Sequence, residues 1–345
     1  MSEISGNGFA AFSDPRRVWG NGIELAIEEA FRLHFKTRII GERIMNIRMP
    51  FAQNNERDVL LDAPLTVAGG GKSSAAVLWP SIESMLDSGD FAAYAAALCD
   101  GREKVIIFDL SQCSWEISDD FVLIARMKAG LYPGLPHRPY VLVSGSNVSE
   151  SDVYNYLYCV GRIGVDCSGF VWNALVYAAS RGGLDLARVV GPSITGGKYS
   201  AADLAWYAGT SLYNSSNPNI ISVDDKIANL RPADIILFRG PDGNMTHSAI
   251  IQSVDFEKGI IRYLQSTDIA LQDERGVHES FVHFDPRHPG ISLRDSSLVW
   301  MNKRQPAFLG EVQETYPDDG KRYRAYPEFG GGRVVRLRAM SQLRF

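Results

Sequence analysis

The sequence predicts an α+β protein, in which a domain with a buried, cysteine-bearing helix on an antiparallel sheet follows a smaller α/β domain. Residues 170–179 (FVWNALVYAA) are almost entirely apolar, as in a buried helix, and three apolar strand-like runs follow within residues 235–266. In residues 1–146, short apolar runs alternate with helical patterns, which favours a small sheet with some parallel pairing.

Length and charge narrow the possible classes of protein. The 345 residues suggest two domains, which we place at 1–146 and 147–345 because the polar segment Ser144–Asn147 separates the two patterns. A net charge of -5 argues against a nucleic-acid partner. The chain starts without a basic, apolar leader, and no apolar run reaches the ~20 residues that cross a bilayer. We therefore expect no membrane span, and either a cytoplasmic protein or export by a non-classical or phage route.

The first domain is expected to alternate helices and strands. Helices are predicted near residues 23–34, 80–86, 91–99 and 117–127, and strands near 37–40, 59–61, 65–67, 105–110 and 140–143. Gly69–Ser73 looks like a phosphate-binding loop, but Thr66 stands where that motif needs its first glycine. A flexible connection is the better interpretation. No other residues of this domain suggest a chemical site, so its role stays open.

The second domain begins with a helix that Ser149 and Asp152 are spaced to cap. The apolar helix that follows starts near Cys167 and ends at the Arg-Gly-Gly of residues 181–183. Residues 182–231 are rich in Gly, Ser and Asn, which predicts a loop on one wall of a cleft, with one helix near 201–207. The chain then forms an antiparallel meander of strands near residues 235–238, 246–251 and 260–266.

The position of Cys167 has a chemical consequence. A helix N-terminus carries unpaired N–H groups and partial positive charge, and both favour the nucleophilic thiolate over the thiol. The N–H groups of Cys167 and Ser168 could also stabilise an oxyanion. A cysteine that is merely buried is the alternative interpretation. His247 opens a strand some eighty residues later, and imidazole, with a reference pKa near ~6.5, suits proton exchange with such a thiol.

These pieces, in this order, resemble the NlpC-type cell-wall cysteine peptidases. The matching segments, within residues 150–290, are Tyr158, Asp166–Val171 (Asp-Cys-Ser-Gly-Phe-Val), Pro232–Phe238, His247–Ile251 and Leu264–Ser266. The resemblance implies a papain-like fold in which Cys167 is the nucleophile, His247 the base and Gln265 the third catalytic group. It also implies hydrolysis of an amide bond in peptidoglycan fragments or stem peptides, typically between γ-D-glutamate and a diamino acid. We expect no cofactor.

The same resemblance implies that Tyr158, Asp166 and Ser168 contact the free amine of a stem peptide. Asp166 is equally well placed to cap the helix, a role worth roughly 1 kcal/mol.

The sequence departs from the family pattern at positions that affect substrate choice. Ala233 stands where the family has a glycine before the aspartate of a turn, and Gly161-Arg162 stands where it has a glycine pair. The third catalytic position, often histidine, is Gln265. Two other functions therefore stay open: an amidase or acyltransferase with the same Cys–His pair, and a binding module without catalytic activity.

The third catalytic group depends on strand register. If Val254 lies opposite Ile260, Gln265 shares a face with His247 and its amide oxygen can accept from the imidazole. A shift of one residue would instead bring Ser266 or Asp268 to that face. We favour Gln265, because the resemblance also puts it at this position.

Other polar residues indicate no further site. His278, His283 and His288 recur every five residues around Asp285-Pro286, which predicts a loop rather than a metal site. The four cysteines are sparse and include no CxxC pair, which argues against zinc and against a disulfide framework. The last thirty residues are basic, and a solvated strand and tail is favoured over a polyanion site.

Overall fold

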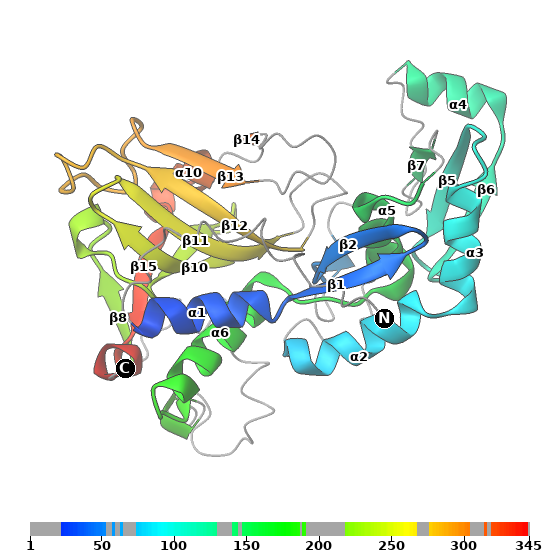
Figure 1. Ribbon diagram of the computed structural model, residues 1–345. Coiled ribbons are helices and arrows are strands. Elements are labelled where there is room, and N and C mark those ends of the chain that lie inside the picture. The colour runs from blue at the N-terminus through cyan, green and yellow to red at the C-terminus, as the bar shows by residue number, and fades with distance from the viewer. Residues whose placement is uncertain are drawn as a thin grey trace.

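The computed structural model shows an α+β protein built from two bodies (Figure 1). It describes residues 22–52, 57–58, 63–64, 74–129, 140–143, 147–186, 188–190, 218–267, 276–303, 314–315 and 319–343. The expected strands at 59–61 and 65–67, the glycine-rich segment 69–73 and the expected helix at 201–207 lie outside these residues. None of the described helices combines the length and the apolar character needed to cross a membrane.

The larger body is an eight-stranded sheet in which every pair of neighbouring strands is antiparallel. Its order is β14 (Glu314–Thr315), β13 (Val299–Lys303), β12 (Gly276–His283), β11 (Ile260–Thr267), β10 (Met245–Asp255), β9 (Ile235–Arg239), β15 (Arg333–Leu337) and β8 (Ile220–Val223). The predicted meander supplies β9, β10 and β11 at the centre. Within the described residues, the 3-10 turns are Ile227–Asn229, Pro327–Phe329 and Arg338–Gln342.

Helices cover both faces of this sheet. On one face, alternate strand residues such as Leu237, Ile250 and Leu264 share a core with α6 (Cys167–Arg181), as expected for a buried apolar helix. On the other face, Phe238 and Tyr263 share a second core with α10 (Asp319–Arg324). Because strand side chains alternate in direction, each strand contributes to both cores.

The smaller body contains the three-stranded sheet of β6 (Ser114–Ser118), β5 (Lys104–Asp109) and β7 (Tyr140–Val143), with helices α2 (Ala75–Leu86), α3 (Gly89–Leu98) and α4 (Phe121–Lys128). The parallel pairing predicted here is wrong, because β5 pairs antiparallel with both neighbours. Only four residues join β5 to β6, and a parallel pair needs a crossover of a dozen or more. The helix expected from residue 117 starts at Phe121, because Ile117 belongs to β6.

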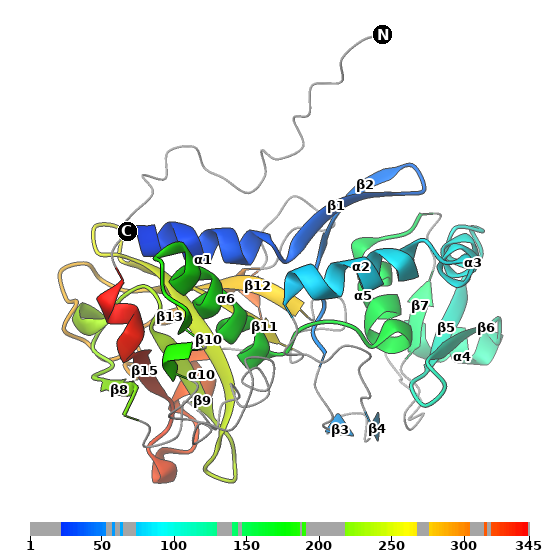
Figure 2. The same ribbon diagram turned by 90° about the horizontal axis from the view of Figure 1, so that it is seen from below.

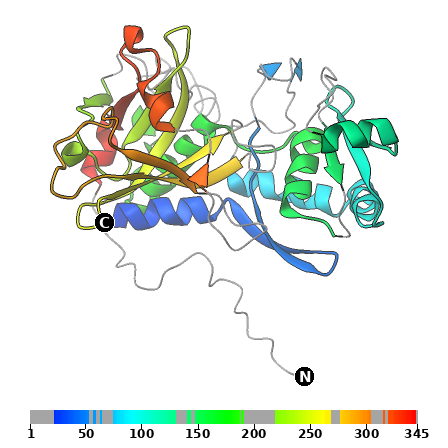
Figure 3. The ribbon, with the colours of Figure 1, turned by 90° about the horizontal axis from the view of Figure 1, so that it is seen from above.

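Packing crosses residue 146 in both directions. Helix α1 (Gly22–Arg32) lies along α6 and against β10 of the larger body (Figure 2). Conversely, α5 (Glu150–Tyr156) and the π-helix Leu157–Gly161 pack with the smaller body, which stands beside the sheet in Figure 3. The hairpin of β1 (Phe35–Ile40) and β2 (Arg43–Arg48) runs between them. The pair β3 (Arg57–Asp58) and β4 (Ala63–Pro64) forms a further two-stranded sheet.

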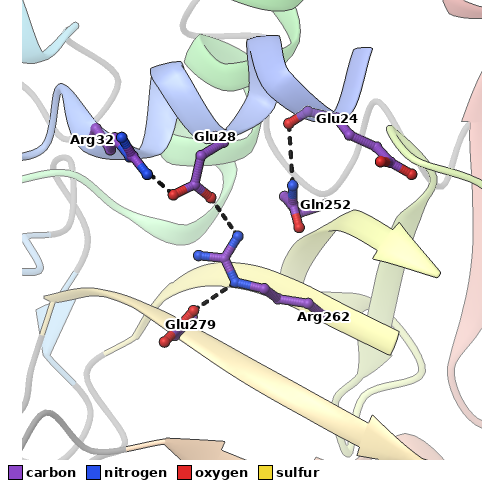
Figure 4. Close-up of polar contacts among 6 residues, drawn as sticks. All are labelled: Glu24, Glu28, Arg32, Gln252, Arg262 and Glu279. Atoms are coloured by element: carbon purple, nitrogen blue, oxygen red, sulfur yellow. Dashed lines mark hydrogen bonds and ion pairs between the residues drawn. The ribbon is translucent and has the colours of Figure 1, made fainter. Parts of the chain in front are cut away.

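A buried ionic cluster fixes α1 to the sheet (Figure 4). Arg262 of β11 is 4% exposed, and its guanidinium donates to Glu28 of α1 and to Glu279 of β12. Beside it, the Gln252 side chain donates to the backbone carbonyl of Glu24 at 3.1 Å. A buried charge needs such partners because its desolvation is costly.

The basic C-terminal stretch differs from the solvated strand and tail that we expected. Strand β15 lies inside the sheet, between β9 and β8, rather than in solvent. Arg336 of this strand forms two bonds to the buried carboxylate of Asp234, with the closest nitrogen and oxygen 2.5 Å apart. At least one positive charge of this stretch therefore neutralises a buried carboxylate within the sheet.

Candidate active site

Helix α6 begins as the sequence predicts, with Asp166 as its N-cap. The Asp166 carboxylate accepts from the backbone N–H of Gly169 at 2.5 Å and from the Ser168 hydroxyl at 3.0 Å. Cys167 is therefore the first helical residue, and it is partly exposed. The N-terminal location favours a thiolate, whereas the adjacent Asp166 carboxylate, which has the same charge, opposes it.

The segment before Cys167 is held against the sheet by Val165. Its carbonyl accepts from the Ser266 hydroxyl of β11 at 2.7 Å, and its N–H donates to the Pro50 carbonyl at 3.0 Å. Gly164 touches the same Pro50 so closely that a Cβ there would stand 2.1 Å from the carbonyl oxygen. These contacts fix the backbone two residues before Cys167 against Ser266, on the α6 face of β11, whereas the Gln265 side chain points to the opposite face, toward α10.

His247 and Gln265 meet as the register argument requires. The His247 Nε2 and the Gln265 Oε1 are 2.7 Å apart, and both side chains are buried, at 3% and 1% exposure. His247 also lies opposite Phe238 of β9, with 5.3 Å between the ring centroids. The predicted hydrogen bond between Gln265 and His247 is therefore confirmed, whereas its role in catalysis stays a prediction.

Two register offsets cancel to produce this contact. At the turn, Asp255 rather than Val254 lies opposite Ile260, which is the one-residue shift that would have turned Gln265 away. A β-bulge at Gln252 then restores the expected pairing, so that Ile250 lies opposite Leu264. The bulged residue is the one whose side chain donates to α1.

A buried carboxylate orients the Gln265 amide. Gln265 Nε2 donates to Asp319 of α10 at 2.9 Å and to the Ser280 hydroxyl at 2.9 Å, and the Tyr263 hydroxyl donates to the same Asp319 oxygen at 2.7 Å. A hydroxyl can donate or accept, but a carboxylate accepts only. Asp319 therefore fixes the amide nitrogen toward itself and the amide oxygen toward His247.

This orientation determines the tautomer of His247. Because Gln265 Oε1 can only accept, Nε2 of the imidazole carries the proton, and Nδ1 of the neutral ring is left as a proton acceptor. Burial lowers the pKa of His247 well below its ordinary value, and the charges of Arg322 and His278 lower it further, against the opposing effect of Gln265. The neutral ring is thus the resting form near neutral pH.

Sequence reasoning missed Asp319. It lies beyond the segment that carries the family resemblance, in a helix of six residues, and 54 positions separate it from Gln265. The residues next to Asp319 in the sequence do not indicate that its side chain is buried.

The other candidate residues take different positions. Ser266 lies on the α6 side, bound to Val165, and Asp268 is outside the described residues. Tyr158 is buried within the π-helix. His278 and His283 belong to β12 rather than to the predicted loop, and His288 is exposed beside Asp285. Within the described residues, no group of three or more potential metal ligands gathers.

Comparison of the chain with models of protein families, with curated proteins and with solved structures gives no match.

Proposed function

We propose that the chain is a cysteine peptidase of the NlpC type, with a papain-like catalytic body. The observation that carries the proposal is the 2.7 Å bond between His247 and Gln265, on strands whose other face packs against the helix that Cys167 begins. It provides a base with a defined tautomer and an orienting partner, the arrangement that a thiol nucleophile requires.

Two departures from the family pattern give independent support. Ala233 and Arg162 stand where the family has glycine, and both have left-handed backbones, with φ of 71° and 46°. This region is costly for residues with a Cβ and is readily adopted by glycine. The backbone here keeps the conformation that explains the family glycines, although the side chains have changed.

The proposed reaction starts with transfer of the Cys167 proton to Nδ1 of His247. The thiolate sulfur attacks the amide carbon, and N–H groups at the start of α6 stabilise the oxyanion. Imidazolium then protonates the leaving amine, which departs as the C–N bond breaks and a thioester remains. Water attacks the thioester, gives its proton to His247, and releases the carboxylic acid and the thiol.

Incubation with purified muropeptides, followed by mass spectrometry, tests the proposal. We expect a gain of one water per cleaved bond in the stem peptide, and none with Cys167→Ala. Products in which the acyl group is transferred to an added amine would instead indicate an acyltransferase. If the muropeptides stay intact but raise the melting temperature of the protein, the chain is a binding module.

A further inference from the structure

Arg322 differs from three other arginines of the C-terminal stretch. Arg336 pairs with Asp234, while Arg324 and Arg338 donate to backbone carbonyls. For Arg322, the side-chain contact within the described part of the chain is the ring of Phe238, whose centroid lies 5.2 Å from Cζ. Arg322 is also half-buried. A guanidinium in such surroundings retains its capacity for a bidentate anion.

Its location relates it to the catalytic pair. The ring of Phe238 that carries Arg322 also lies 5.3 Å from the ring of His247. Arg322 is three residues after Asp319 in α10, so the two side chains lie on the same side of that helix. Asp319 in turn reaches Gln265. Helix α10 thus contributes two charged groups near the His247–Gln265 pair. Asp319 accepts from Gln265, and Arg322 lies on the ring of Phe238, which also contacts His247.

We propose that Arg322 binds a carboxylate group of the substrate beside His247. This inference builds on the proposed function, and it names the chemistry that the substrate must carry near the bond to be cleaved. A stem peptide offers such groups on glutamate and on the diamino acid. Amidated peptides, which lack one of these charges, are then poor substrates.

The charge of Arg322 also gives bound carboxylate a role in the reaction. The imidazolium form of His247 is the acid that protonates the leaving amine. Burial, Arg322 and His278 disfavour this form, whereas the hydrogen bond to Gln265 favours it. A carboxylate on Arg322 offsets the larger of these two charge effects. The correct substrate therefore assists the base that acts on it.

Alkylation of Cys167 tests the site without relying on hydrolysis. Iodoacetate and iodoacetamide have the same shape and differ in the carboxylate, and each is attacked by the thiolate with loss of iodide. At low ionic strength, we expect the rate ratio of iodoacetate to iodoacetamide to fall about 10-fold in Arg322→Met, which keeps a long apolar stem on Phe238. Arg324→Met, on the same helix, is the control and should leave the ratio unchanged. An unchanged ratio in Arg322→Met would overturn the inference.

Kinetics on three matched tripeptides then identify the group that is bound. The peptides are L-alanyl-γ-D-glutamyl-diamino acid, its glutamyl carboxamide and its diamino-acid carboxamide. We expect the wild-type kcat/KM to fall about 10- to 100-fold with one carboxamide, and Arg322→Met to lose that preference. Equal preference in both proteins would refute the inference while leaving the peptidase proposal intact. If the wild type cleaves none of the peptides, the peptidase proposal fails, and the alkylation ratio alone decides on Arg322.

Discussion

Replacing Gln265 with alanine tests the proposed chemistry most directly. The substitution removes the acceptor that lies 2.7 Å from His247 Nε2 and leaves a buried N–H of the imidazole unpaired. Hydrogen bonds to a charged group contribute about 1.5–3 kcal/mol, and the ring becomes charged during turnover. We therefore expect turnover of stem-peptide hydrolysis to fall about 10- to 150-fold, at 1.4 kcal/mol per factor of ten. Cys167 should still react with alkylating reagents, because the thiol and its helix are untouched.

Two further measurements distinguish orientation from general damage. In nitrogen-15 NMR spectra, His247 should carry its proton on Nε2 in the wild type and lose this preference in Gln265→Ala. Asp319→Ala should have the same effect to a smaller degree, because Gln265 still reaches His247 but its amide can rotate. Ser248→Ala is the control: it removes a buried hydroxyl from the next residue, on the opposite face.

One pair of results would refute the reasoning. Full turnover and an unchanged tautomer in Gln265→Ala, together with a collapse of turnover in Ser266→Ala, would mean that the orienting group lies on the other face of β11.

Three other predictions concern reactivity and stability. At near-neutral pH, iodoacetamide should label Cys167 before the two exposed cysteines, and mass spectrometry of the digest measures the order; slower labelling would contradict a thiolate. Arg262→Met should lower the free energy of unfolding in urea by about 3–5 kcal/mol, because it removes a buried cation that two carboxylates share, whereas Arg287→Met at an exposed pair should leave this free energy nearly unchanged. Burial lowers the pKa of His34 to about 4, so the unfolded chain binds more protons below pH ~6.5. Stability should therefore fall as pH drops from ~6.5 toward 4, by about 2 kcal/mol for this residue at pH 5, and His34→Gln should remove that share; equal acid sensitivity would contradict it.

The sequence was sufficient where a local rule determines the structure. The cap at Asp166, the apolar helix after Cys167 and the alternating strands each depend on residues within a few positions of one another. The Gln265–His247 contact was predicted correctly, but for an incomplete reason. The turn register and the bulge at Gln252 were both missed, and their effects cancel.

What could not be predicted depends on partners far away in the sequence. The bulge at Gln252 places a side chain on Glu24, which is 228 positions away, and Asp319 reaches Gln265 across 54 positions. No window of neighbouring residues contains either relationship. The parallel pairing was wrong for a different reason: Ser114–Ser118 has a strand that the helical pattern from residue 117 concealed, and a short hairpin turn then forces antiparallel pairing.

The docking of α1 has a consequence for biosynthesis. The ion pair between Glu28 and Arg262 cannot form until Arg262 has been synthesised, 234 residues after Glu28. At 5–20 residues per second this is a delay on the order of 10–50 s, during which the apolar side of α1 has no sheet to cover. The smaller body can be completed once α5 has been made, but α1 has to wait, because its partners α6 and β10 follow the smaller body in the sequence. A nascent chain of this protein therefore carries α1 without its ionic anchor for most of its synthesis.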